Sequence, residues 1–176
     1  MKAIYLTGFM GAGKTTIGQK LGQALNVPVV DTDQFIEEKV GKRIADIFSE
    51  DGEQTFRKYE RSYLKEIPTR NIVTTTGGGI VIQEENRRWM KENGYVVFLY
   101  CDIDKIFERV QIDPTRPLFD SEKKENTIKL YNERMPFYNE AHYKIDTTEK
   151  NLDEVVNDLL SWLQLQKGGN NITTRK

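Results

Sequence analysis

The chain carries near its start the stretch Gly8-Phe9-Met10-Gly11-Ala12-Gly13-Lys14-Thr15-Thr16. This stretch fits G-x-x-x-x-G-K-[ST], the pattern of a phosphate-binding loop. The short apolar segment Ala3-Ile4-Tyr5-Leu6-Thr7 precedes it, and Ile17 and Leu21 follow with the spacing of one helix face. Strand, glycine loop and helix in this order are the context that the motif requires. The alternative is a glycine turn that matches by chance.

Each residue type in the loop suits a bound nucleotide phosphate. Glycines allow a tight turn whose N–H groups point inward, and the start of the following helix adds a positive dipole end. Lys14 can reach the β- and γ-phosphates, and the Thr15 hydroxyl can ligate Mg²⁺. The residues expected to bind the nucleotide here are Gly11, Ala12, Gly13, Lys14, Thr15 and Thr16.

The totals favour one domain with a real core, because 176 residues bury most of their unfolded surface. We expect this domain to span residues 1–166 and the polar segment 167–176 to be a disordered tail. Charged residues make up 30% of the chain and the net charge is −1, so no basic excess points to nucleic acid. No segment approaches the roughly 18 apolar residues of a membrane span.

The chain has one cysteine and one histidine, which limits the disulfide, metal and histidine-based chemistry that it can carry. Cys101 is the only cysteine, which excludes an internal disulfide and fits a reducing compartment, and its apolar surroundings predict a buried thiol. His142 is the only histidine, which argues against a histidine-based triad or metal site. The first strand begins at once, so no cleaved signal is evident and we expect the cytoplasm.

The segments alternate between the two secondary-structure periods. Helical patterns separate apolar strand candidates at residues 2–7, 28–31, 71–76, 95–101 and 143–146. Such alternation predicts a parallel sheet with right-handed crossovers, and strands apolar on both faces predict helices on both sides. Among the helices, 52–67 should end before Pro68, 84–93 should end at Gly94, and Asn151 with Glu154 should cap the last one.

Residues 111–124 break this pattern with two prolines, mixed charge and little periodicity. They could be an inert linker. A mobile lid is the sharper interpretation, because a phosphotransferase must exclude water or it will hydrolyse ATP. Arg116 lies in the middle of this segment, where it could reach the phosphates.

The ends of the second and third strands form a second cluster. Ligands of open parallel sheets bind beyond the carboxyl ends of strands, which here carry Asp31-Thr32-Asp33 and Thr76-Gly77-Gly78-Gly79. Asp33 either meets a ligand or simply caps the helix that follows. Three consecutive glycines suggest a ligand or another backbone packed against bare main chain, with a sharp bend as the alternative.

Two arginines complete the set of candidates. Arg57 lies off the apolar face of its helix and is followed three residues later by Glu60, and Arg134 lies near a helix end that Pro136 disturbs. Either could be an ordinary surface charge. They become informative only if an anion must be held beside the triple glycine.

Taken together, these motifs resemble the shikimate kinase family over residues 1–163. The phosphate loop alone marks a very large superfamily, whereas six motifs in this order are much more specific. The motifs are Gly8 to Thr15, Asp31-Thr32-Asp33, Phe56-Arg57-Lys58-Tyr59-Glu60, Thr76 to Gly79, Arg116-Pro117-Leu118, and Arg134 with Pro136 and Tyr138.

The resemblance implies a three-layer α/β/α P-loop kinase fold with a five-stranded parallel sheet and a mobile lid. It implies transfer of the ATP γ-phosphoryl group to the 3-hydroxyl of shikimate. Asp33 and the main chain of Gly78 would meet shikimate, whose carboxylate Arg57 and Arg134 would grip, with Glu60 holding Arg57. The remaining implied roles concern the donor: Lys14 and Arg116 at the phosphates, Arg109 near the adenine, and Thr15 directly and Asp31 through water on Mg²⁺.

Two other functions remain open at this stage. A gluconate-kinase-like enzyme would keep the phosphate loop and the arginines, although T-G-G-G with F-R-x-x-E argues against it. A nucleotide-binding switch would bind ATP without an acceptor-dependent reaction, but Lys14, Thr15, Asp33 and Arg116 are all in place. For partners we expect shikimate and ATP, no nucleic acid, no membrane, and a monomer. No residue of the loop 146–150 is assigned to the adenine.

Overall fold

The computed structural model describes residues 1–111 and 121–169. Strands and helices alternate along the chain, as the sequence predicts. The strands are β1 (Ala3–Thr7), β2 (Val29–Asp31), β3 (Val73–Thr75), β4 (Gly94–Tyr100) and β5 (Tyr143–Asp146). The helices are α1 (Lys14–Leu25), α2 (Thr32–Val40), α3 (Ile44–Asp46), α4 (Glu53–Leu64), α5 (Glu84–Asn93), α6 (Ile103–Gln111), α7 (Ser121–Tyr138) and α8 (Leu152–Gly169). A π-helical turn, η1 (Ile47–Asp51), and a 3₁₀ turn, η2 (Ile80–Ile82), complete the set.

The five strands form one parallel sheet in the order β2-β3-β1-β4-β5. This confirms the predicted P-loop kinase fold. The central strand, β1, is buried along its whole length, and its side chains are apolar except for the hydroxyls of Tyr5 and Thr7, of which Thr7 donates to the Val97 carbonyl oxygen (3.2 Å). Because β1 and β3 are neighbours, the phosphate loop and the triple glycine leave the sheet side by side.

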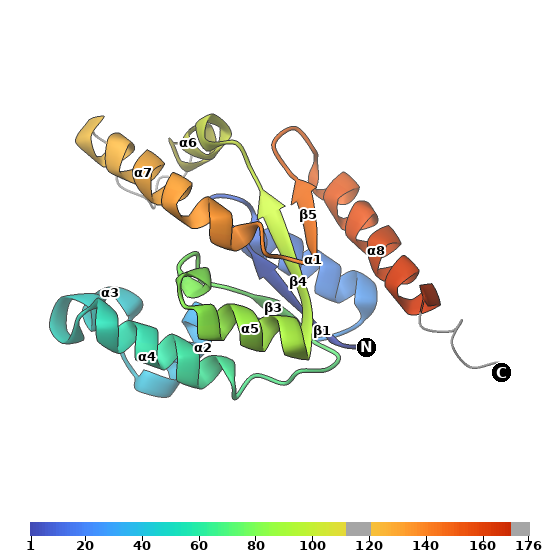
Figure 1. Cartoon of the computed structure of the whole chain (residues 1–176), viewed down its shortest axis with the longest axis horizontal. Coiled ribbons are helices and arrows are strands. Elements are labelled where there is room, and N and C mark those ends of the chain that lie inside the picture. Colours follow the sequence, from blue (N-terminus) through green and yellow to red (C-terminus); the bar gives the residue numbers. More distant parts are fainter. Residues whose placement is uncertain (112–120, 170–176) are drawn as a thin grey trace.

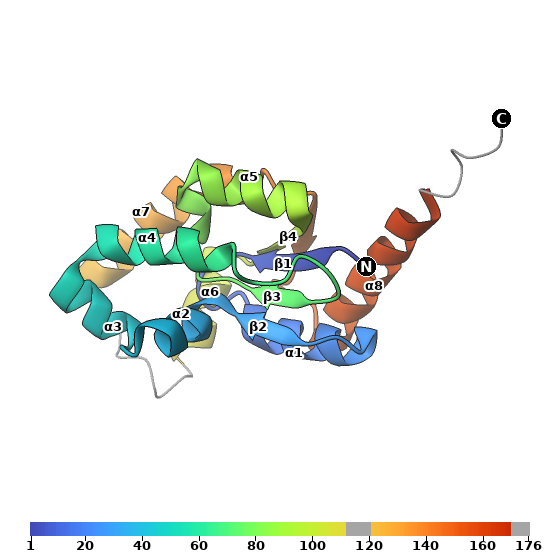
Figure 2. The ribbon, with the colours of Figure 1, turned by 90° about the horizontal axis from the view of Figure 1, so that it is seen from below.

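Helices cover both faces of the sheet. Figure 2 shows α5 on one face and α1 on the other, with α2 and α3 at the end of the sheet away from the N-terminus. Figure 1 shows α8 beside α1 and α7 running past the carboxyl ends of the strands. The main core lies between these layers. A separate small cluster of Ile36, Ile47 and Phe56 joins α2, η1 and α4.

Most predicted helix ends are confirmed, but α4 ends at Leu64, before the predicted end at residue 67. Asn151 Oδ1 accepts from the Glu154 N–H (3.0 Å) and Glu154 Oε2 accepts from the Asn151 N–H (2.7 Å), so the capping box is present. Helix α5 ends at Gly94 as expected, but Gly94 is extended and is the first residue of β4. A side chain there would have its Cβ 2.5 Å from the Ala3 carbonyl oxygen, so this glycine provides space.

Two segments differ from the expected boundaries or fall outside what is described. The predicted lid, 111–124, contains residues 112–120, and Arg116 with them lies outside the described residues. Helix α8 continues to Gly169, three residues into the segment expected to be tail, and residues 170–176 are not described. Helix α7 contains Pro136 and ends at Tyr138, so Arg134 lies near a helix end as predicted. None of the helices within 1–111 and 121–169 has the length and apolar character of a membrane span.

Candidate active site

The phosphate loop has the left-handed backbone that its glycines predict. Gly11 and Gly13 have φ values of 78° and 90°, in the region that side chains disfavour. Gly13 is also the residue before α1. The N–H groups of the loop therefore lie next to the N–H groups at the N-terminus of this helix. Loop and helix therefore form an anion-binding cradle at the end of β1.

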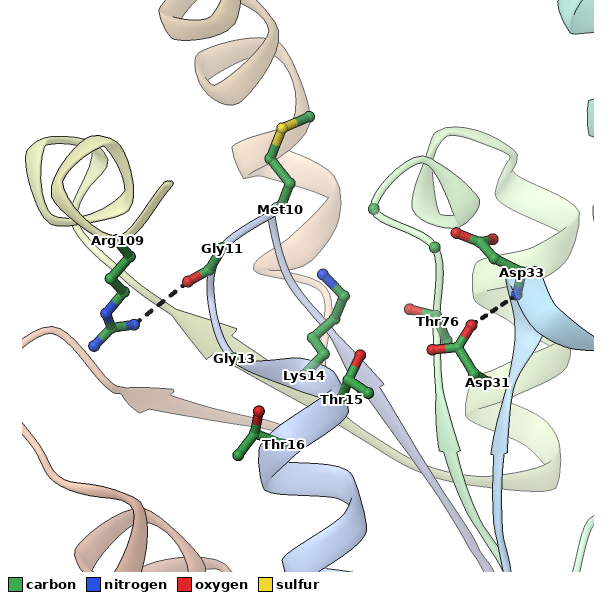
Figure 3. Close-up of a pocket in the computed structure, with 12 residues that line it drawn as sticks. Met10, Gly11, Gly13, Lys14, Thr15, Thr16, Asp31, Asp33, Thr76 and Arg109 are labelled. Atoms are coloured by element: carbon green, nitrogen blue, oxygen red, sulfur yellow. Dashed lines mark hydrogen bonds between the residues drawn. The ribbon is translucent and has the colours of Figure 1, made fainter. Parts of the chain in front are cut away.

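Lys14 lies inside the curve of this loop. Its Nζ donates to the carbonyl oxygens of Gly8 (2.7 Å) and Phe9 (2.9 Å). Figure 3 shows the ammonium beside the cleft, with Thr15 and Thr16 at the start of α1 below it. Lys14 and Thr15 both line the same cleft as Asp31 and Asp33, as the sequence predicts for a donor and an acceptor that must meet.

The two aspartates of Asp31-Thr32-Asp33 have separate environments. Asp31 caps α2, because its Oδ1 accepts from the N–H groups of Asp33 (3.0 Å) and Gln34 (3.3 Å). Its Oδ2 accepts from the Thr75 hydroxyl (2.6 Å). The alternative in which Asp33 caps this helix is therefore wrong. Figure 3 shows the two carboxylates pointing in different directions.

Asp33 is held as a partly desolvated carboxyl. Its Oδ1 is buried without a hydrogen-bond partner among the described residues. Burial and, to a lesser degree, the charge of Asp31 raise the pKa of Asp33 to about 6, against the opposing effects of Lys14 and Arg57. A carboxyl with this pKa is ionised at neutral pH and can still take up a proton.

The triple glycine is needed for space. None of Gly77, Gly78 and Gly79 has a left-handed φ, so backbone strain does not explain them. A Cβ on Gly77 would lie 2.5 Å from Asp33 Oδ1, and one on Gly79 would lie 2.7 Å from Arg57 Cζ. The side chains of Asp33 and Arg57 therefore pack against the bare main chain, where the sequence interpretation expected a ligand or another backbone.

Arg57 is a buried charge with two partners. Only 11% of its side chain is exposed, and its Nη1 donates to Glu60 Oε2 at 2.5 Å. This is the predicted contact between the two residues. Glu53, on the preceding turn of α4, is a second partner that the sequence interpretation missed (Arg57 Nη2 to Oε1, 2.9 Å). Its i,i+4 spacing was the available signal.

Glu60 is fully buried, which dominates its acidity. Burial raises the pKa of Glu60 to about 7, although Arg57 acts in the opposite direction. Its second oxygen, Oε1, has no hydrogen-bond partner among the described residues. Glu60 therefore places a titrating charge behind the guanidinium that faces the glycines.

Arg134 approaches the glycine turn from α7. A Cβ on Gly78 would lie 3.6 Å from Arg134 Nη1 and 3.6 Å from the Tyr138 hydroxyl oxygen. The guanidinium also lies over the Phe9 ring, 5.9 Å from its centroid, and Nε is buried without a partner in the described part of the chain. Arg57 and Arg134 thus reach neighbouring residues of one glycine turn, Gly79 and Gly78, from different helices.

Arg109 connects the loop to the end of the fifth strand. Its Nη2 donates to the Thr147 carbonyl oxygen (2.7 Å), and its Nη1 donates to Cys101 Sγ (3.2 Å) and, at 3.5 Å, to the Gly11 carbonyl oxygen. A hollow beside the phosphate loop is lined by Arg109, Thr147, Lys150 and Leu152. The sequence analysis did not assign the residues of this loop to the adenine. The available sequence signal was Asp146, a residue type that favours turns; in the structure its Oδ1 accepts from the Thr148 N–H (2.9 Å).

One cleft of about 340 Å³ joins most of the predicted residues. It is lined by loop residues, by Asp31 and Asp33, by Gly77 and Gly78, and by Arg109. Arg57 and Arg134 border it through the glycine turn. The residues expected to be inert are also in place: Cys101 is buried, and the Val96 N–H donates to His142 Nδ1 at 3.0 Å. Within the described residues no cluster of three histidine, cysteine or acidic side chains forms a metal site.

Comparison with known families agrees with this geometry. A family model described as shikimate kinase matches residues 10–164. The chain belongs to the shikimate kinase family. The matched residues include the phosphate loop from Met10 onward, both aspartates and all the arginines discussed above. Membership of this kinase family makes the protein a phosphate-transferring enzyme.

Relatives named shikimate kinase match over nearly their whole length. One from Bacillus cereus (strain G9842) is 55% identical over 159 residues, which cover 90% of this chain and 96% of the relative. One from Persephonella marina is 42% identical over 161 residues, covering 91% and 98%.

Solved structures give the same result. Shikimate kinase from Acinetobacter baumannii in complex with shikimate has a TM-score of 0.84 at 35% identity, covering 98% of this chain and 96% of that one. A gluconokinase from Sinorhizobium meliloti 1021 has a TM-score of 0.66 at 16% identity, covering 99% and 98%, and therefore shares the fold alone.

Proposed function

We propose that the protein transfers the γ-phosphoryl group of ATP to the 3-hydroxyl of shikimate, giving shikimate 3-phosphate and ADP. The observation that carries this is the glycine turn Gly77–Gly79, packed between Asp33, Arg57 and Arg134 at the edge of the phosphate-binding cleft. Two cations, one carboxylate and bare main chain suit a small polyol that bears a carboxylate. Shikimate has this chemistry, and the Acinetobacter baumannii relative is described in complex with it.

The donor half follows from the loop. The N–H groups of Gly11 to Thr16 and the N-terminus of α1 hold the phosphates, and Lys14 supplies positive charge to the transferring group. Arg109 stands beside the adjoining hollow, where the adenine would lie. Arg116 would add charge from the segment outside the described residues.

The residues at the cleft fit Mg²⁺. The Thr15 hydroxyl is a direct ligand in this proposal, whereas Asp31 acts through water, because both its oxygens already accept hydrogen bonds from protein groups. Bound Mg²⁺ would neutralise charge between the β- and γ-phosphates.

In the acceptor half, Arg57 and Arg134 grip the shikimate carboxylate, and Gly78 contacts the substrate through its main chain. Planar guanidinium groups suit a planar carboxylate, and Arg57 is held for this by Glu60. Asp33 orients the acceptor hydroxyl and accepts its proton as the phosphoryl group transfers. Its raised pKa and unpartnered oxygen support that role.

A coupled ADP-release assay tests the proposal. With MgATP, shikimate should give acceptor-dependent ADP release, and gluconate should give none above the rate without acceptor. Release with gluconate in place of shikimate would favour the gluconate-kinase alternative. ATP binding without any acceptor-dependent release would instead favour a nucleotide switch.

The assembly and the compartment also belong to the proposal. The single cysteine fits a reducing cytoplasm, and the net charge of −1 gives nucleic acid and membrane surfaces little to attract. We expect a monomer. A sedimentation experiment with the full chain checks the mass.

A further inference from the structure

Thr32 lies between the two aspartates but does not face the cleft as they do. It is 2% exposed, and its hydroxyl oxygen accepts from the Gly77 N–H at 2.9 Å. Strands β2 and β3 pair in parallel with Asp31 opposite Thr75, so this bond joins the first residue after β2 to the second residue after β3. It fixes the peptide group between Thr76 and Gly77.

Tyr138 holds the other end of the turn. Its hydroxyl donates to the Gly78 carbonyl oxygen at 2.6 Å, which fixes the peptide group between Gly78 and Gly79. The ring is 1% exposed and stacks on Phe98, with centroids 5.0 Å apart. Stacking leaves the hydroxyl little freedom to leave the carbonyl.

The middle peptide group is fixed as well, since the Gly77 carbonyl oxygen accepts from the Ile80 N–H at 3.2 Å. All three peptide groups of the turn therefore have a set orientation despite the freedom of glycine. The N–H groups of Gly78 and Gly79 have no acceptor among the described residues. They remain available to a ligand beside Arg57 and Arg134.

We propose that Thr32 and Tyr138 are positioning residues, whose hydroxyls clamp the Gly77–Gly79 turn so that its free N–H groups meet the carboxylate or hydroxyls of the acceptor. This rests on the proposed function for the identity of the acceptor. Thr32 acts through the turn, Tyr138 acts through the turn and through its contact with Arg134, and neither changes the ATP side. The glycines leave space for Asp33 and Arg57 but are conformationally free. The two hydroxyls hold the backbone of the turn in one conformation.

The test uses variants that remove single hydroxyls from the full chain. Thr32→Val and Tyr138→Phe should each raise KM for shikimate about tenfold, the effect of one lost hydrogen bond, with KM for ATP unchanged. Thr32→Ser should restore the lower KM. Matched controls are Thr74→Val and Tyr5→Phe, because both hydroxyls are buried and without a partner in the described structure; neither should change the shikimate KM.

Equal rises in both KM values, or the same rise in the controls, would overturn the positioning role in favour of a structural one. If Thr32→Val does not fold, the KM values of Tyr138→Phe for shikimate and ATP test the positioning role, with Thr32→Ser expected to keep the wild-type values. Exchange of the Gly77 amide in the free protein gives an independent readout: Thr32→Val should speed it at least about tenfold and Thr74→Val should not. That readout stands even if wild type shows no shikimate-dependent ADP release, a result that would sink only the proposed function.

Discussion

Gly77 and Asp33 are so close that a methyl group on Gly77 would place its carbon 2.5 Å from Asp33 Oδ1. The end of β3 is thus shaped to receive the side chain that follows β2. Gly79 and Arg57 have the same relationship at the other end of the turn. The absence of side chains at Gly77 and Gly79 therefore leaves the space that Asp33 and Arg57 occupy. Substitutions of single glycines by alanine test this.

Gly77→Ala should lower kcat about tenfold or more, because the new methyl group displaces the Asp33 carboxylate from its position. Steady-state ADP release checks this, with circular dichroism to verify the fold. Gly78→Ala leaves Asp33 in place, since the three nearest neighbours of its Cβ lie at 3.6 Å, and it should affect KM for shikimate more than kcat. A wild-type kcat for Gly77→Ala would mean that the position of Asp33 is not critical.

Asp33→Asn should lower kcat by a factor of about 10² if this residue orients the acceptor and takes its proton. The pH profile gives a second check. Because the pKa of Asp33 is raised to about 6, wild-type kcat/KM for shikimate should fall below pH 6 as the carboxylate becomes protonated. The Asn variant should lose that step and keep only the earlier fall, from about pH 7, that protonation of Glu60 causes. An unchanged profile in the variant would show that Asp33 does not titrate in this reaction.

The same substitution should stabilise the folded protein. Asp33 has its ordinary pKa of 3.8 when unfolded and about 6 when folded, so the folded state binds the proton more tightly. Its contribution is favourable below pH 4, is lost as pH rises to 6, and leaves a cost above that. Asp33→Asn should raise Tm on the order of 5 °C at pH 8 and much less at pH 4. Calorimetry at the two pH values measures this; a lower Tm at pH 8 would contradict it.

Much of the fold was predictable because its signals are local. Strand and helix periodicity, the loop pattern and the pair Asn151 and Glu154 each act within a few residues, and their elements are where the sequence puts them. Local sequence patterns could not predict whether Asp31 or Asp33 caps α2. That is decided by Thr75, 44 residues from Asp31 in the sequence, whose hydroxyl holds the second Asp31 oxygen.

The candidate site also combines residues that local motifs identify with contacts that only the folded chain reveals. Each of Asp33, Arg57 and Gly78 stands in a short motif that sequence comparison can find. Their mutual packing depends on which strands become neighbours, as do the Thr32 contact with Gly77 and the Tyr138 contact with Gly78. A single sequence gives no distance between segments 45 or 60 residues apart.

The final prediction concerns the two acids that hold Arg57. Glu60 is fully buried, whereas 60% of the Glu53 side chain is exposed. Glu60→Gln should raise KM for shikimate about tenfold at pH 8, because a buried charge-assisted bond no longer orients the guanidinium. Glu53→Gln should change it less than about twofold, as for an exposed ion pair.

The pH dependence separates orientation by charge from simple packing. Since burial raises the pKa of Glu60 to about 7, wild-type Glu60 loses its charge as pH falls toward 6. The ratio of the Glu60→Gln and wild-type KM values should therefore shrink from pH 8 to pH 6, whereas a packing defect would keep the ratio constant. A constant ratio, or equal effects of both substitutions, would show that the Glu60 charge does not position Arg57.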